Sequence, residues 1–241
     1  MIRNIKTIMR QDREPYRIPR RVQDVIPIQC VWPDGIFKVG IKFSKTYRFT
    51  DINYKVASRN DKETMFLAYS ELLNSLDCAA TTKLTICNRR QSQADFEQSV
   101  LMPMREDGLD KYRREYNQML MDKATGANGI TQEKYVTITV YKRDIEDARA
   151  YFTRIGADLT ARFAALGSKC VELDATDRLR ILHDFYRAGD EGNFHFDMAD
   201  MARKGHDFRD YICPDGIEKH SDYLKLGDRY CRVLFLKDYA N

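Results

Sequence analysis

Hydrophobic residues recur along the chain with two periods, and each period predicts a different kind of element. Alternation of apolar and polar positions puts every second side chain on one face, and it predicts strands at 37–43, 82–88, 134–142 and 169–175. Apolar residues that repeat every three or four positions predict helices at 61–78, 144–166 and 176–189. A further helical stretch, split near Pro103 and ended by the glycines of 125–129, lies between the second and third strands.

Local signals predict where these elements begin and end. Asn60 and Glu63 have the spacing of a capping box, so they predict the start of the first helix. Ser92 is predicted to cap the first piece of the split helix, and Gly167 to end the long helix. The second piece of the split helix carries an apolar stripe made of Leu109, Tyr112, Tyr116, Met119 and Leu120.

The segment Trp32-Pro33-Asp34-Gly35 predicts a hairpin turn. Proline presets the backbone, aspartate bonds back to it, and glycine tolerates a positive φ. The alternating residues after it are predicted to form one strand with one face on the core, formed by Phe37, Val39, Ile41 and Phe43. Pro-Asp-Gly-Ile recurs at 214–217, which favours a second use of a good turn over a structural repeat.

The order of elements between Lys83 and Leu173 is strand, helices, strand, helix, strand. This is most of a ferredoxin-like split βαβ core, and antiparallel β-hairpins flank it on both sides. The sequence therefore predicts an α+β fold. At the other end, residues 227–241 are predicted to supply the last strand of the sheet that began far earlier in the chain, with Gly227 and Asp228 joining it to its neighbour.

Charge changes this picture only near the N-terminus. The 241 residues are 43% hydrophobic and 32% charged with a net charge of +4, as in a soluble globular protein, and this charge alone implies neither a nucleic-acid nor a membrane partner. Basic residues gather in an N-terminal arm, residues 1–20, and just after it. Those that could contact membrane lipid, a phosphate backbone or a protein partner are Arg10, Arg13, Arg17, Arg20 and Arg21. A solvated arm is the favoured interpretation.

The sequence has no window apolar enough for a membrane span and no apolar core of a secretory signal, so we expect a cytoplasmic chain. Its six cysteines include no Cys-x-x-Cys pair. Most of them alternate with apolar neighbours in strand-like runs, so we predict buried, reduced thiols instead of disulfides or zinc ligands.

Motifs that carry chemistry are missing from the sequence. It contains neither the GxxxxGK[ST] string of a phosphate-binding loop nor a Gly-x-Ser-x-Gly elbow. A zinc cluster of His195, His206, Cys213 and His220 is disfavoured, because structural zinc ligands usually come as close pairs. Tyr135 and Tyr141 lie on one predicted strand and could stack bases as in an RNA-binding sheet, but ordinary sheet packing is favoured. The residues alone predict no catalytic, cofactor or metal site.

Several longer strings resemble a known family. "YRIPRRVQDVIPIQCVWPDGIFKVG", "KTYRFTDINYKVAS", "DKETMFLAYSELLNSLD" and "TTKLTICNRR" are similar to the N-terminal region of the large conjugative-transfer ATPases of Firmicutes. These ATPases form the TrbE/CagE/VirB group, which energises type IV secretion. The later string "YICPDGIEKHSDYLKLGDRYCRVLFLKDYA" resembles the hairpin that leads out of that region. The resemblance runs in matching order from Tyr16 to Ala240.

The resemblance implies what the residues alone do not. Residues 21–241 would be the α+β N-terminal domain of a larger ATPase, whose P-loop domain with its ATP and Mg²⁺ would follow Asn241. This chain would then need no cofactor and would have no catalytic residue. Its expected role is docking to other type IV secretion subunits, including membrane components, at the cytoplasmic membrane face during DNA transfer, with self-association of the full-length protein. The alternative is a nucleic-acid-binding module that contacts the transferred DNA.

Overall fold

The computed structural model describes residues 19–52, 54–90, 101–126, 130–201, 203 and 205–236. Six elements form its core, in the chain order β3 (Lys42–Phe49), α2 (Arg59–Asn74), β4 (Thr81–Arg90), β5 (Ile130–Tyr141), α5 (Ile145–Ala165) and β6 (Cys170–Glu172). The strands lie in the order β4-β5-β3-β6, and every neighbouring pair is antiparallel. This βαββαβ arrangement is the ferredoxin-like fold. The predicted α+β class is therefore confirmed. The ferredoxin-like core is present, but it begins at β3 and includes α2, whereas the predicted core began at Lys83 and included the helical stretch before β5. That stretch contains α4 (Asp110–Gly126), which is inserted between the paired strands β4 and β5.

A short hairpin extends the sheet beside the first residues of β3. Its strands are β1 (Cys30–Val31) and β2 (Phe37–Val39), and the predicted turn between them forms with a left-handed Gly35 at φ 76°. The predicted single strand 37–43 is wrong. The chain reverses at Gly40, where φ is 59°, and Ile41 in this turn is 69% exposed. Residues 37–39 therefore pair with 42–44 as neighbouring strands.

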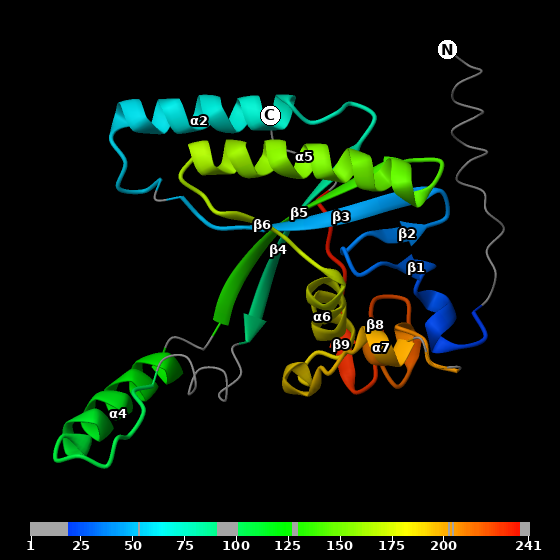
Figure 1. The fold of residues 1–241 in the computed structure, drawn as a ribbon. Coiled ribbons are helices and arrows are strands. Elements are labelled where there is room, and N and C mark those ends of the chain that lie inside the picture. Colours follow the sequence, from blue (N-terminus) through cyan, green and yellow to red (C-terminus); the bar gives the residue numbers. More distant parts are fainter. Residues whose placement is uncertain are drawn as a thin grey trace.

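Helices α2 and α5 cover one face of the sheet (Figure 1). The predicted apolar stripe of α5 is confirmed: Phe152 and Leu159 are fully buried against Phe43 and Ile138 of the strands. Asp144 caps this helix by accepting a hydrogen bond from the Asp147 N–H, and the chain leaves it through Gly167 at φ 77°. Burial of two such large side chains stabilises the fold by about 2 kcal/mol each.

Helix α2 is more loosely packed than its sequence suggested. It begins after Ser58, whose hydroxyl accepts from the Asp61 N–H, so the predicted cap at Asn60 is wrong. The helix ends at Asn74, four residues before the predicted end. Among its residues, all of which the structure describes, Leu72 alone is buried.

The opposite face of the sheet packs on α6 (Ala175–Tyr186). The guanidinium of Arg178, inside this layer, donates to the carbonyls of Gly35 and Ser44, both at 2.7 Å, and to the Ser44 hydroxyl at 3.1 Å. It also lies 3.9 Å from the centre of the Phe37 ring. Burial lowers the pKa of Arg178. This one side chain therefore joins α6 to the hairpin and to β3.

Apart from α4 (Asp110–Gly126), the remaining elements are short and complete this second layer. They are the 3₁₀ turns Val22–Val25 and Glu191–Asn193, the helices α7 (Met198–Met201) and α8 (Arg209–Ile212), and the strands β7 (Ile217–Lys219), β8 (Leu224–Leu226) and β9 (Arg229–Cys231). The predicted strand pair joined at Gly227 is confirmed. The two Pro-Asp-Gly turns differ, because the structure gives a positive φ at Gly35 but not at Gly216.

The expectation for residues 227–241 is wrong in its long-range part. Strand β9 belongs to a separate three-stranded sheet with β7 and β8, and it does not join the core sheet. Residues 232–236 follow it outside any strand, and Val233 to Leu236 are 69–83% exposed. The local sequence pattern correctly predicted the turn at Gly227, but it did not identify which sheet the strand joins.

Candidate protein-interaction site

The most prominent feature of the molecule is a helical arm inserted into the core hairpin. Strands β4 and β5 pair over their full lengths, from Thr81 opposite Thr139 to Arg90 opposite Ile130. Helix α4 (Asp110–Gly126) lies beyond the far end of this two-stranded ribbon and stands away from the rest of the molecule (Figure 1). An ordinary ferredoxin-like hairpin needs only a short turn here. The insertion therefore serves something other than closing the fold.

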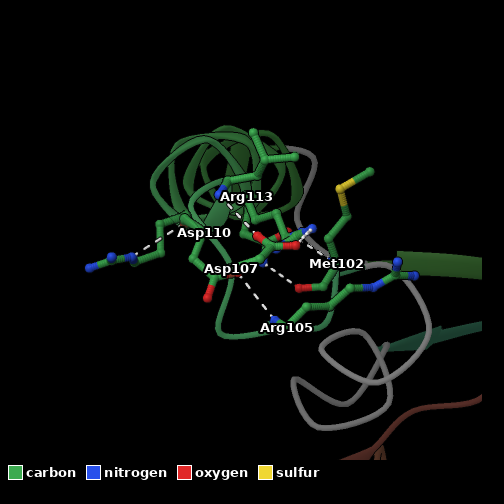
Figure 2. A network of polar contacts seen from close by, with 8 residues as sticks. Met102, Arg105, Asp107, Asp110 and Arg113 are labelled. Carbon is green, nitrogen blue, oxygen red and sulfur yellow. Dashed lines mark hydrogen bonds and ion pairs between the residues drawn. The ribbon is translucent and has the colours of Figure 1, made fainter.

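A network of ion pairs builds the start of α4 (Figure 2). Arg113 donates to both oxygens of Asp107, at 2.5 and 2.7 Å, and to Asp110 at 2.5 Å. The Arg113 hydrogen bond lowers the pKa of Asp107, and the Arg105 N–H, followed by Arg113, lowers that of Asp110. The two carboxylates raise the pKa of Arg113 in return. Negative charge in a first helical turn also suits the helix dipole.

A second contact fastens the preceding segment along the helix. The Asn117 side chain donates to the Met102 carbonyl and accepts from the Met102 N–H, both at 2.9 Å. The Asp107 carboxylate also accepts from the Leu109 N–H at 2.9 Å. Residues 102–110 are thus held on one side of α4 by specific polar contacts, which leaves the other side of the helix open.

That open side is apolar. We call Leu109, Tyr112, Tyr116 and Met119 the α4 stripe. They are spaced at three and four residues, so they share one helix face, and they are 44–64% exposed. These are four of the five residues of the stripe predicted from the sequence; the fifth, Leu120, is half-buried. The structure adds that no described part of the body covers the stripe. Lys111, Glu115 and Asp122 are exposed along one flank of the stripe, so this flank carries both signs of charge.

A second apolar surface lies on α2. We call Phe66, Tyr69 and Leu73 the α2 shelf; their spacing again places them on one helix face, and they are 65%, 42% and 46% exposed. The sequence predicts this helix from its apolar spacing, but the spacing does not show which of the apolar residues are exposed. The available signal was the excess of large apolar residues, since 65–73 carries more of them than one buried face needs.

The open face of the β4–β5 ribbon, α6 and β9 enclose a cleft of about 620 Å³. Two polar contacts lie in it: Arg89 pairs with Asp184 at 2.9 Å, and the Tyr135 hydroxyl donates to Glu133 at 2.6 Å. Glu191, Arg229 and Arg232 also line the cleft. Burial, followed by the nearby Glu133 carboxylate, raises the pKa of the Cys87 thiol. A thiol with a raised pKa is a poor nucleophile at neutral pH. The Arg89–Asp184 ion pair joins the ribbon to α6.

The basic residues near the N-terminus are only partly within the structure. Arg10, Arg13 and Arg17 lie outside the described residues. Arg20 and Arg21 are exposed. Their backbone N–H groups both donate to the Asp24 carboxylate, at 3.3 and 3.1 Å. The predicted cap at Ser92 also lies outside the described residues. Among the helices in the described ranges, none is long and apolar enough to cross a membrane.

The other candidate residues are not brought together. The described residues contain no group of three or more His, Cys, Asp or Glu placed to hold a metal ion, so His195, His206, Cys213 and His220 do not cluster. All six cysteines are described and free, but Cys30 and Cys78 are exposed, so the prediction of buried thiols is wrong for these two. Tyr135 is 4% exposed, whereas Tyr141 is 55% exposed, so only Tyr141 presents its ring to solvent.

Comparison with models of known protein families gives no match for this chain, and a search of curated proteins finds no relative.

Proposed function

We propose that this chain is a non-catalytic docking and assembly domain, the N-terminal part of a conjugative type IV secretion ATPase. It would contact channel subunits at the cytoplasmic face of the membrane during DNA transfer. The observation that carries the proposal is the α4 arm, because it presents an amphipathic helix with its apolar side to solvent. An amphipathic helix in water has nothing to bury that side against unless a partner supplies it.

Two further features support this function. The strings quoted above resemble the N-terminal region of that ATPase family in matching order, and the motor domain with ATP and Mg²⁺ would lie beyond Asn241. The basic residues Arg10 to Arg21 would meet anionic lipid or a membrane subunit. The nucleic-acid-binding alternative is less well supported, because Tyr135 is buried and bonded to Glu133, which leaves only Tyr141 of the two candidate stacking residues exposed.

The test is DNA transfer from donor cells that carry the Tyr112→Glu variant of the whole protein. Tyr112 is 64% exposed, so the substitution leaves the fold intact and places a charge in the α4 stripe. Transfer is expected to fall at least tenfold at an unchanged protein level. The control is Gln118→Glu, which adds the same charge on the opposite, exposed side of α4. Wild-type transfer by the Tyr112 variant would contradict a docking role for the arm.

A further inference from the structure

The guanidinium of Arg178 is a buried positive charge without a carboxylate partner in the described part of the chain. It is 9% exposed, and its three hydrogen bonds all go to neutral oxygens, the carbonyls of Gly35 and Ser44 and the Ser44 hydroxyl. Its Nε–H has no acceptor among the described residues. Buried charges are usually paired, because removing an isolated charge from water is costly. The described residues therefore leave this positive charge uncompensated.

Arg178 lines a cavity of about 220 Å³ between α6 and the open face of the sheet. The register places Lys83 of β4, Thr137 of β5 and Thr46 of β3 in one row across three neighbouring strands. The Thr46 and Thr137 hydroxyls lie 2.9 Å apart, so one donates to the other and the second keeps a free hydrogen. Apart from Arg178 and Tyr135, the polar residues that line the cavity are Lys83, Thr85, Thr137, Thr46 and Ser44.

The charge of this cavity has one sign. Among the described residues that line it there is no Asp or Glu, and both charged ones, Arg178 and Lys83, are basic. Lys83 is exposed on the edge strand β4, so it places the second positive charge where the cavity meets solvent. The neighbouring 620 Å³ cleft differs, because carboxylates line it together with arginines. Only the smaller cavity is therefore suited to an anion by its charge.

The size and the donors of the cavity indicate which anion fits. Its volume is below the range of about 300–1,000 Å³ for sites that hold drug-sized ligands, so it suits a small ion. Guanidinium, ammonium and hydroxyl groups all donate hydrogen bonds to anionic oxygens. These donors come from three strands and from α6, and a tetrahedral ion such as phosphate has oxygens that point in several directions at once. A planar carboxylate would reach fewer of them.

We propose that this cavity binds inorganic phosphate or a similar tetrahedral oxyanion between Arg178, Lys83 and the hydroxyls of Thr46 and Thr137. The site goes beyond the proposed docking function and does not depend on it. The bound ion would neutralise Arg178 at the point where this side chain joins α6 to the hairpin and to β3. Because the ion binds only the folded chain, it would also stabilise this layer of the molecule.

NMR titration of the 241-residue chain with sodium phosphate tests the proposal, with sodium chloride adjusted to keep the ionic strength and the screening constant. We expect saturable shifts of the amide signals of Lys83 and Thr137, with a Kd of about 1 mM or lower. The Nε–H signal of Arg178 should move with the same midpoint, since the ion becomes its acceptor. This signal reports on Arg178 in the wild type, so the destabilised Arg178→Met variant is not needed.

Lys83 offers variants that leave the fold intact, because its side chain is exposed. Lys83→Gln removes the positive charge at the edge of the cavity and should raise the Kd for phosphate at least about fivefold. Lys83→Arg keeps the charge and should bind within about twofold of the wild type. The matched control is Lys111→Gln, which removes the same charge from α4, away from the body, and should leave the Kd unchanged (Figure 1).

Four results would each overturn the inference. They are no saturable shift up to about 20 mM phosphate, a stationary Arg178 Nε–H signal, wild-type affinity in Lys83→Gln, and acetate that binds as tightly as phosphate. All four are independent of the DNA-transfer assay. A chain that binds phosphate but transfers DNA normally without Tyr112 would lose the proposed docking function and keep this site. A chain that needs Tyr112 for transfer but binds no phosphate would keep the docking function alone.

Discussion

Gly35 and Gly167 offer a matched test of how the hairpin meets α6. Both glycines have the same left-handed backbone, with φ of 76° and 77°. A Cβ on Gly35 would lie 2.0 Å from the carbonyl oxygen of Leu173, whereas a Cβ on Gly167 would meet nothing within 4 Å. Changing each to alanine therefore separates the cost of the backbone conformation from the cost of the close approach.

The magnitudes follow from these two terms. The left-handed conformation costs alanine about 1–2 kcal/mol, and reduced freedom of the unfolded chain returns about 0.4–1 kcal/mol, so Gly167→Ala should lose about 1 kcal/mol of unfolding free energy. In Gly35→Ala the hairpin must also move away from the backbone at Leu173, which adds about 1–3 kcal/mol. Urea unfolding followed by circular dichroism should show Gly35→Ala to be less stable by about 2 kcal/mol. Equal losses in the two variants would refute the close approach.

Two further perturbations test the second layer and the arm. Arg178→Met leaves the carbonyls of Gly35 and Ser44 without this donor and should lower the unfolding free energy by about 3 kcal/mol. The control, Arg180→Met, changes an exposed site of the same helix and should lower it by about 0.5 kcal/mol. Similar losses for the two variants in urea unfolding would contradict the bridging role of Arg178. The pKa values of Asp107 and Asp110 are lowered in the folded state. Their contribution to the stability of the folded arm is therefore present above about pH 4 and is lost as the pH falls through the lowered values. NMR should therefore show that the amide chemical shifts at the start of α4 change when the wild type is acidified. In Arg113→Gln these shifts should already differ from those of the wild type at pH 7. The same response to acid in both proteins would count against the network.

Element boundaries show how local information can mislead by a few residues. Asn60 and Glu63 had the spacing of a capping box, yet Ser58 caps the helix. Several neighbouring polar residues could each act as the N-cap, and only the path of the preceding chain selects one of them. The alternation from Phe37 to Phe43 looked like one strand. It became two because Gly40 allowed the chain to reverse and pair with itself.

The candidate site was foreseeable only in part. The α4 stripe could be located from its spacing, but that spacing is the same for a helix that packs on a core and for one that faces water. The α2 shelf was missed for the same reason. The hydrogen bonds by which Arg178 joins α6 to the hairpin and β3 have no sequence signal, because their three acceptor atoms belong to residues more than a hundred positions away.

The sequence by itself determined the periodicity of each segment and thus most of the order of strands and helices, which is enough for the α+β class but not for which elements form the ferredoxin-like core. These properties depend on neighbours a few residues apart. Only the tertiary structure decided that β9 joins a separate sheet, that Gly35 lies against Leu173, and that α4 stands away from the body. Each of these depends on which distant segment packs beside an element. The hydrophobic effect is non-directional, so the apolar pattern of an element does not show which segment will cover it.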